Sequence, residues 1–337
     1  MPHAVLSRRT LLTAAGLVAP ALLAGGRRAA AQALQDVVFL TPFGQLPGYA
    51  PDYVGVSDGI FEKNGIKVRI VGGNGSAAAI QQVVSGQALI ARTGGIDVVR
   101  AVSGVNAPVR AVGTIAHTTT FKVISSADAP IKGPADLEGK TVGIVSAGGG
   151  TENYLDIMLA HVGARRDTVK RQVVGNSPGA FEMVKLKRLD AFIADTGVVL
   201  QLRARKEPVF VLDIDPFASV PGQVYVASED GIARHGDALL AYLRGIRTAM
   251  QAIAADTSGA MTLKAMQPFN LADLRDPDTA MSAVRAEQVL WQARGTENLV
   301  KIIPSAWQTG WQEMVGAGLA TAGDPSRAYT TAFSDKL

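Results

Sequence analysis

Two stretches of the chain, about 100 residues apart, carry the same pattern, and this repeat constrains the fold more than any other feature. Residues 71–78, VGGNGSAA, correspond to residues 173–180, VVGNSPGA. Further on, residues 88–94, ALIARTG, correspond to residues 191–197, AFIADTG. We interpret the repeat as two similar βαβ units, each of which presents a glycine-containing loop to a shared cleft. The alternative is a chance match in a chain rich in glycine and alanine.

Short apolar runs alternate with amphipathic segments through the first two thirds of the chain, which is typical of α/β folds with mainly parallel strands. A helix is expected over residues 76–85, where Ile80 and Val83 share one face and Gly86 is placed as a C-terminal cap. The chain has 337 residues, enough for two domains of ordinary size. Strands are expected at residues 37–40, 67–71, 88–91, 109–113 and 141–145.

The last third of the chain, from residue 232 on, has mostly helical spacing. Residues 238–255 and 280–294 are the clearest predicted helices. Trp307 and Trp311 lie beyond them, and we interpret these aromatic residues as packing residues because apolar residues at such spacing commonly face a core.

Residues 1–33 have the features of an export signal. Residues 7–12, SRRTLL, form a twin-arginine pattern, an apolar run over residues 11–24 follows, and residues 31–33, AQA, match a cleavage site. The apolar run contains Pro20 and is shorter than the roughly 20 residues of a membrane-spanning helix, so we favour a signal over an anchor. We therefore expect a periplasmic protein that is exported by the twin-arginine pathway and is not anchored in a membrane.

The positive charge of the chain belongs to this predicted signal. Its only charged residues are Arg8, Arg9, Arg27 and Arg28, and without them the chain has 29 basic and 29 acidic residues. A neutral protein lacks the clustered basic surface on which nucleic-acid binding depends, so we expect no nucleic-acid partner.

The residue types that carry catalysis and metal binding are sparse. The chain has no cysteine, and its four histidines are scattered, with no H-E-x-x-H motif. It has neither a G-x-S-x-G motif nor a P-loop, and the dinucleotide-type pattern at residues 73–78 lacks its last glycine because Ala78 occupies that position. We therefore predict no metal, no cofactor and no enzymatic activity.

The positive case for a binding site depends on the starts of helices. Ser76, Thr151 and Ser177 follow glycine-containing loops and are predicted N-caps, with Pro178 in the first turn of the third helix. A helix N-terminus exposes unpaired N–H groups and the positive end of its dipole, so several of them in one cleft could hold a carboxylate or sulfonate. Each cap taken alone could also be purely structural.

The candidate ligand-binding residues end strands or begin helices, where ligands of open α/β sheets bind. For several of them an ordinary structural role is the alternative, and Arg92 could be either a cleft residue or a solvated strand end. We favour a small organic anion as the ligand and leave a neutral, pyrimidine-type ligand open. The candidates are Phe43, Gln45, Asn74, Gly75, Ser76, Thr93, Gly94, His117, Ser146, Gly149, Gly150, Thr151, Asn176, Ser177 and Asp195.

Four motifs give the chain a resemblance to a known family. Residues 59–68 read GIFEKNGIKV, residues 73–86 join a glycine-rich loop to a helix that ends in glycine, residues 136–143 read DLEGKTVG, and residues 187–191 read KRLDA. Over residues 37–230 the order of these motifs resembles the NMT1/THI5-like family of periplasmic binding proteins, which includes the sulfonate, taurine and nitrate binding components of ABC importers. The arginine that precedes Leu-Asp-Ala departs from the usual glycine of that family and is expected to alter only a helix end.

The resemblance implies an α/β fold of the type II periplasmic-binding-protein class, with two Rossmann-like lobes joined by two crossing strands. Residues 121–125 and 223–228 look like these crossing strands. Lobe 1 would then comprise residues 34–120 and 226–337, and lobe 2 residues 121–225.

The resemblance further implies a solute-binding component of an ABC importer, which captures its ligand by hinge closure and presents it to a permease in the inner membrane. Such a protein is expected to be a monomer. A sensor-coupled binding protein remains the first alternative. Enzymes of this superfamily that make the thiamin pyrimidine carry a cysteine-rich stretch that this chain lacks, so that alternative is weaker.

Overall fold

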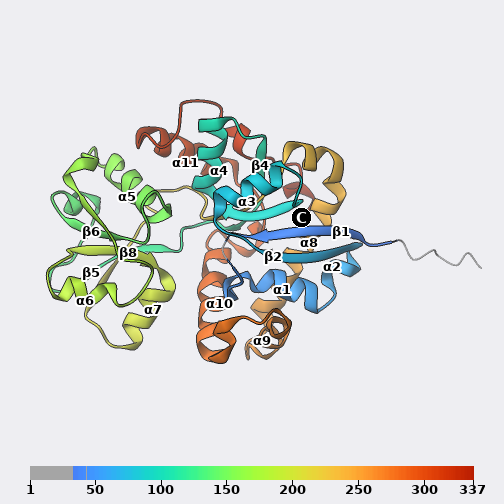
Figure 1. The fold of residues 1–337 in the computed structure, drawn as a ribbon, viewed down its shortest axis with the longest axis horizontal. Coiled ribbons are helices and arrows are strands. Elements are labelled where there is room, and N and C mark those ends of the chain that lie inside the picture. Colours follow the sequence, from blue (N-terminus) through green and yellow to red (C-terminus); the bar gives the residue numbers. More distant parts are fainter. Residues whose placement is uncertain (1–32, 43) are drawn as a thin grey trace, which may run out of the picture. The chain divides into compact units, whose positions relative to one another are not determined.

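A computed structural model describes residues 33–42 and 44–337 of the chain (Figure 1). The predicted export signal therefore lies outside the described residues, apart from its last residue, and so does Phe43. Among the described helices, none combines the length and the apolar character that a membrane span requires.

The first sheet contains five strands in the order β2-β1-β3-β10-β4. β1 is parallel to β2 and β3, whereas β10 is antiparallel to β3 and β4. The apolar run in β1 places both Phe39 and Leu40 in the core, on opposite faces of the strand, as expected for a strand covered by helices on both sides. The strands are β1 (Gln35–Thr41), β2 (Ile66–Gly72), β3 (Ile90–Gly94), β4 (Val109–Ala116) and β10 (Gln223–Ser228).

The second sheet repeats this arrangement in the order β7-β6-β8-β5-β9. β6 is parallel to β7 and β8, and β5 is antiparallel to β8 and β9. Each sheet thus holds one antiparallel strand, which is the fourth strand in its order. The chain passes from β4 of the first sheet to β5 of the second, and from β9 of the second sheet back to β10 of the first. The strands are β5 (Phe121–Ser126), β6 (Thr141–Ile144), β7 (Lys170–Val173), β8 (Ala191–Asp195) and β9 (Val209–Asp213).

The shared topology follows the internal sequence repeat. Residues 71–78 join β2 to the helix α3, and residues 173–180 join β7 to the helix α6. The second pair of similar segments forms β3 up to the N-cap of α4, and β8 with the first two residues of α7. The predicted architecture of two Rossmann-like lobes is confirmed, and the two predicted crossing strands correspond to β5 and β10.

Helices cover both sheets, and the long ones gather in the last third of the chain, as predicted (Figure 1). Trp307 and Trp311 are 1% and 2% exposed, which confirms that these aromatic residues pack in the core. The helices are α1 (Ala50–Ser57), α2 (Ile60–Lys63), α3 (Ser76–Val84), α4 (Gly95–Val105), α5 (Gly150–His161), α6 (Ala180–Lys185), α7 (Thr196–Ala204), α8 (Glu229–Ala255), α9 (Ala260–Met266), α10 (Pro277–Gln292) and α11 (Pro304–Gly316).

The two connections between the sheets touch each other. Gly222, just before β10, donates its N–H to the carbonyl oxygen of Ala116 at 3.0 Å. A Cβ atom on Gly222 would lie 2.1 Å from the carbonyl oxygen of Thr118, so any side chain at this position would clash with backbone. This close approach holds the segment that leaves the first sheet after β4 against the segment that returns to it before β10.

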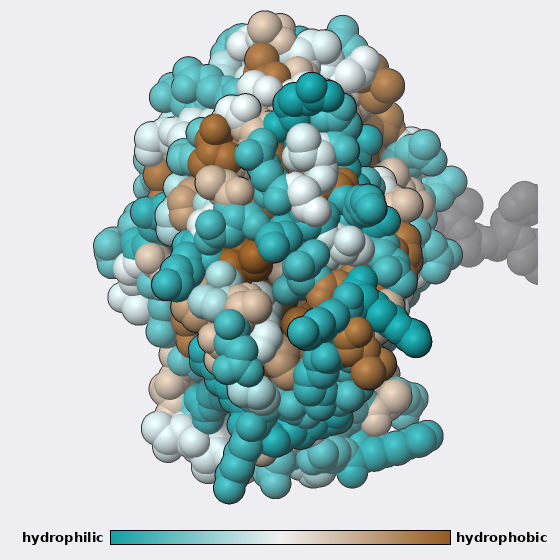
Figure 2. Space-filling view, turned by 90° about the vertical axis from the view of Figure 1, so that its left-hand side faces the viewer, coloured by the Kyte–Doolittle hydropathy of each residue, from teal (hydrophilic) through white to brown (hydrophobic). Residues whose placement is uncertain are grey.

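Side chains on the surface of the second lobe are mostly hydrophilic. Figure 2, which views the molecule from that side, shows teal surface with scattered brown residues. Leu186 and Val173 are among the exposed apolar side chains there, and single residues of this kind are ordinary on a protein surface.

Candidate functional site

A pocket of about 110 Å³ lies where the two lobes and both connections meet. We call it the interlobe pocket. Its walls come from the starts of α3 and α4 in the first lobe, from the start of α5 in the second lobe, and from the two connections. The lining residues are Pro42, Ser76, Gly94, Ile96, Asp97, Thr119, Thr120, Phe121, Gly150, Tyr154, Gly222 and Gln223.

On the first-lobe side the pocket is built around Asp97, in the first turn of α4. Burial raises the pKa of the Asp97 carboxyl, while a hydrogen bond with the Ser76 side chain, the nearby Arg100 charge and the Gly94 backbone N–H oppose that rise. Acidic residues in the first turn stabilise a helix through its dipole, which accounts for the position of Asp97 in α4. The hydrogen bond to Ser76 ties the starts of α3 and α4 together.

On the second-lobe side the pocket is bounded by α5 and by the start of β5. Tyr154 is 4% exposed, and a hydrogen bond joins its hydroxyl to that of Thr119. Burial raises the Tyr154 pKa, so this hydroxyl stays protonated. The ring of Phe121 meets the Tyr154 ring edge-on with 5.9 Å between ring centroids. This wall therefore offers an aromatic pair as well as hydroxyl groups.

The predicted helix caps need correction. The N-cap residues are Gly75 for α3, Gly149 for α5 and Gly179 for α6, each without a side-chain cap hydrogen bond. Ser76 and Thr151 lie inside their helices, and Ser177 lies before its helix. The loops close without a serine or threonine cap because their side chains find other partners.

These three side chains have local structural roles. Ser76 bonds to Asp97, as described above. The Thr151 hydroxyl accepts a hydrogen bond from the N–H of Val145 at 3.0 Å, and the Ser177 hydroxyl accepts one from the N–H of Gly179 at 3.2 Å.

Of the candidate residues predicted from the sequence, the structure brings Ser76, Gly94 and Gly150 together as lining residues of the interlobe pocket. Their neighbours Asn74, Gly75, Gly149 and Ser146 belong to the same two loops without lining it. Thr93 is fully buried in β3, and no described residue is bonded to its hydroxyl.

Other candidates lie elsewhere in the fold. His117 is buried, its Nε2 donates to the carbonyl oxygen of Asn298 at 2.9 Å, and burial lowers its pKa. Gln45, in the loop after β1, has a buried Oε1 to which no described residue donates.

Asp195 and Asn176 form a reciprocal pair at the start of α7. Asn176 Nδ2 donates to Asp195 Oδ2 at 2.6 Å, and the Asp195 N–H donates to Asn176 Oδ1 at 3.1 Å. Asp195 Oδ1 also accepts a hydrogen bond from the N–H of Val198 at 3.0 Å, which makes Asp195 the N-cap of α7. Neither residue lines the interlobe pocket.

Arg92 is neither a cleft cation nor a solvated strand end. Its side chain is 2% exposed and forms an ion pair with Glu287 of α10 at 2.7 Å. It also donates to Gln223 Oε1 at 2.7 Å and to the carbonyl oxygen of Gly48 at 2.9 Å. Its charge is therefore used to hold α10 and the start of β10 in place.

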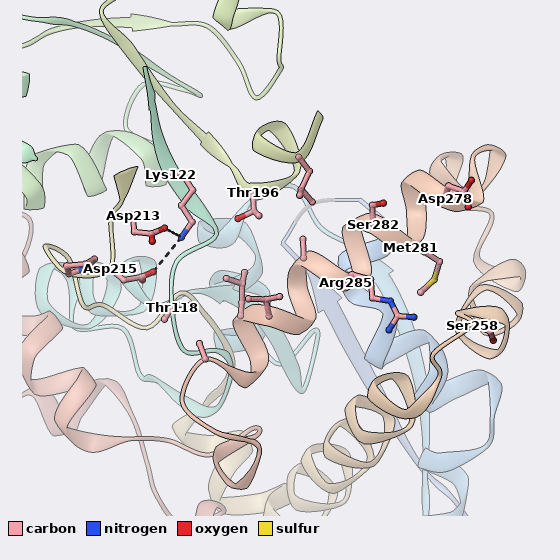
Figure 3. A pocket seen from close by; sticks show the side chains of 16 residues that line it. Thr118, Lys122, Thr196, Asp213, Asp215, Ser258, Asp278, Met281, Ser282 and Arg285 are labelled. Carbon is pink, nitrogen blue, oxygen red and sulfur yellow. Dashed lines mark ion pairs between the residues drawn. The ribbon is translucent and has the colours of Figure 1, made fainter. Parts of the chain in front are cut away.

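A second, larger cavity of about 980 Å³ lies along α10 (Figure 3), and we call it the α10 groove. Lys122 of β5 lines it and forms ion pairs with Asp213 at 2.9 Å and Asp215 at 3.7 Å. Arg285 of α10 also lines it and donates to the carbonyl oxygens of Asp256 and Thr257, both at 2.9 Å. These cations already have protein partners, and none of the candidate residues lines this groove.

Sequence reasoning missed Asp97, Thr119 and Tyr154 as residues of the pocket. Asp97 lies in α4, for which the sequence predicted no helix, and Tyr154 lies in α5, where a polar residue in a helix ordinarily indicates the solvent face. The available signal was position: both lie in the first one or two turns of a helix that follows a strand. Within the part of the chain that the structure describes, no group of histidine and acidic residues is arranged to hold a metal ion.

Comparison with known proteins gives a family and a fold. The family model described as NMT1/THI5 like matches residues 46–260, whereas comparison with curated proteins gives no match. The periplasmic aliphatic sulphonate binding protein SsuA from Escherichia coli has 17% sequence identity and a TM-score of 0.63, covering 85% of this chain and 86% of that chain.

Two further solved structures show how varied the proteins with this fold are. The periplasmic nitrate-binding protein NrtA from Synechocystis PCC 6803 has 14% identity and a TM-score of 0.58, covering 90% of this chain and 86% of that chain. The desulfurization enzyme DSZB has 14% identity and a TM-score of 0.56, covering 90% of this chain and 98% of that chain. At such identities the likeness shows the fold alone. The family match covers more than half of the chain, and the chain belongs to the NMT1/THI5-like family, with the fold of periplasmic binding proteins.

Proposed function

We propose that this chain is the periplasmic solute-binding component of an ABC importer, and that it captures a small organic acid in the interlobe pocket without changing it chemically. The single observation that carries the proposal is the composition of that pocket, to which both lobes and both connections contribute. A solute that contacts both lobes stabilises the arrangement in which the lobes are closed, by its differential affinity for that arrangement.

The acid group of the ligand is assigned from the helix starts. α3, α4 and α5 each begin at the pocket, through Ser76, Gly94 with Asp97, and Gly150. The unpaired N–H groups and the dipoles of these helices favour a carboxylate or a sulfonate. A pyrimidine-type heterocycle is the second candidate, favoured by the aromatic pair of Phe121 and Tyr154.

The partner of the closed protein would be an ABC permease in the inner membrane, and the binding protein itself would be a monomer. The lobe division carried into this proposal is residues 34–120 with 226–337 against residues 121–225. Export would use the twin-arginine pattern at Arg8 and Arg9. Replacing both arginines with lysine is then expected to keep the protein out of the periplasmic fraction.

Thermal denaturation of the purified protein with a panel of sulfonates, carboxylates, nitrate and pyrimidines tests the proposal. A ligand at 100 times its Kd is expected to stabilise the protein by about 2.7 kcal/mol through mass action, which raises the Tm. Ser76→Leu is expected to abolish that rise because the larger side chain enters the pocket. Ala77→Leu is the control, since Ala77 is exposed on the same helix and does not line the pocket. A panel without any binder, or full binding by Ser76→Leu, would contradict the proposal.

The likeness to DSZB favours an enzyme as the alternative function. Incubating the protein with its best-bound ligand and recovering that ligand unchanged, as followed by NMR, is the result that the binding function predicts. Conversion of more than one ligand molecule per protein molecule would instead establish an enzyme.

A further inference from the structure

The charge of the interlobe pocket does not suit a simple anion. Its lining contains one carboxyl group, that of Asp97, and neither lysine nor arginine is among the lining residues. Nearby cations are engaged elsewhere: Arg92 pairs with Glu287, and Lys122 pairs with Asp213 and Asp215 on the side of the α10 groove. An anionic group held by helix starts would thus share a small pocket with a carboxyl group of the protein.

The Asp97 carboxyl has capacity for a further partner. A carboxylate has about four acceptor positions, and at Asp97 the hydrogen bonds come from the Ser76 side chain and the Gly94 N–H. Arg100, one turn further along α4, is exposed and reaches the carbonyl oxygen of Gly148 in the second lobe at 3.5 Å. Arg100 acts on Asp97 through its charge but does not line the pocket, and no lysine or arginine is among the described residues that line it beside Asp97.

The opposite wall favours the same kind of partner as Asp97. Phe121 and Tyr154 line the pocket as an edge-to-face pair, and aromatic faces attract cationic nitrogen groups. The Tyr154 and Thr119 hydroxyls can accept hydrogen bonds from an N–H group as well. The pocket thus combines a carboxyl group with two aromatic rings in one small space. Such a combination favours a ligand with an N–H group.

We propose that the solute of the interlobe pocket is amphoteric: it carries an ammonium, amidinium or ring N–H group that binds the Asp97 carboxyl, beside the acid group held by the helix starts. The inference rests on the proposed solute-binding function and narrows its substrate class. It excludes nitrate and simple alkanesulfonates or carboxylates as the preferred ligands. Asp97 then acts as the specificity-determining residue of the pocket.

Isothermal titration of the wild-type protein with matched pairs of compounds tests this inference. Each pair has the same carbon chain and the same acid group, with and without a terminal amine: ethanesulfonate with 2-aminoethanesulfonate, propionate with 3-aminopropionate, and butyrate with 4-aminobutyrate. At least one amine-bearing member is expected to bind ten times or more tightly than its partner, because a charge-assisted hydrogen bond is lost with the amine.

The variant Asp97→Asn is expected to reduce or reverse the preference within that pair, while Asp278→Asn keeps it. Asp278 is the matched control, since it is an exposed carboxyl that lines the α10 groove and not the interlobe pocket. Should Asp97→Asn fail to fold, which circular dichroism would show, the wild-type comparison still decides. Binding of the amine-free members alone, or equal binding within every pair, overturns the inference and leaves the proposed function standing. Absence of binding by every member counts against both.

Discussion

Asp52 has a carboxyl group that is buried in the core of the first lobe, and this residue does not line the interlobe pocket. It is fully buried, and it accepts hydrogen bonds from the hydroxyls of Tyr225, at 3.2 and 3.3 Å, and of Tyr242. Burial raises its pKa to about 6 from an ordinary value of 3.8, although both tyrosines and the Arg92 charge oppose the rise. A buried carboxylate that is not bonded to a cation lowers the stability of the folded lobe at neutral pH.

The sign of the resulting pH dependence follows from this raised pKa. The folded state binds the Asp52 proton more tightly than the unfolded state, so the contribution of Asp52 to stability is complete below pH 4 and is lost as the pH rises through 6. The difference corresponds to about 3 kcal/mol. Asp52→Asn is expected to remove this part of the pH dependence, measured by urea denaturation between pH 4 and pH 8. An unchanged slope in the variant would show that Asp52 does not titrate in this range.

Single residues also show which parts of the pocket could be predicted from the sequence and which could not. The candidates Ser76, Gly94 and Gly150 could be found because each begins a helix or ends a strand in a strand–loop–helix pattern. Asp97 and Tyr154 could not, because a helix pattern says which face is polar and not which polar residue meets another lobe. Arg92 misled for the same reason: its ion pair with Glu287 joins residues 195 positions apart.

At the scale of elements, the contact between the two connections controls how the lobes are joined. Gly222 and Thr118 approach so closely that only glycine fits, and Gly95 at the start of α4 lies equally close to the carbonyl oxygen of Pro221, at 2.2 Å from an added Cβ. These contacts hold the start of α4, and with it Asp97, against the returning strand β10. The connections are thus part of the pocket wall, and we expect them to act as its hinge as well.

Gly222→Ala is expected to lower the free energy of unfolding by about 1–3 kcal/mol, because the added methyl group forces backbone apart in a packed region. The measurement is chemical denaturation, with ligand affinity measured on the same variant. Gly104→Ala is the control: Gly104 lies exposed in α4 with no atom within 4 Å of an added Cβ, and alanine there is expected to stabilise the helix by up to about 1 kcal/mol. Equal free energies of unfolding for Gly222→Ala and the wild type would show that the backbone of the connections adjusts to the added methyl group without loss of stability.

The elements themselves were largely predictable. Buried parallel strands appear as apolar runs, and the repeated loop pattern predicted two sheets of like topology. The helix starts were predicted less well, because glycine caps replace the expected serine and threonine caps at α3 and α5. In these loops the backbone supplies the turn, and the hydroxyls of Ser76 and Thr151 bond within the structure instead.

At the scale of the whole molecule, contacts besides the connections join the two lobes. Arg166 of the second lobe donates to the carbonyl oxygen of Ala317, at the end of α11, at 2.9 Å. The apolar faces of α11 and α5 share one core cluster, which includes Trp307 and Met158. The lobes are therefore expected to move about this packed side while the pocket side opens and closes.

The distance between the lobes in solution shows whether a solute is captured between them. The chain has no cysteine, so Lys67→Cys and Arg188→Cys, at exposed positions of the first and second lobe, give a unique pair of sites for spin labels. Pulsed electron paramagnetic resonance would compare the doubly labelled protein with and without a saturating amount of its best-bound solute. Capture between the lobes predicts a shorter and narrower distance distribution with the solute, and no change in the Ser76→Leu variant. Identical distributions with and without bound solute would contradict capture between the lobes.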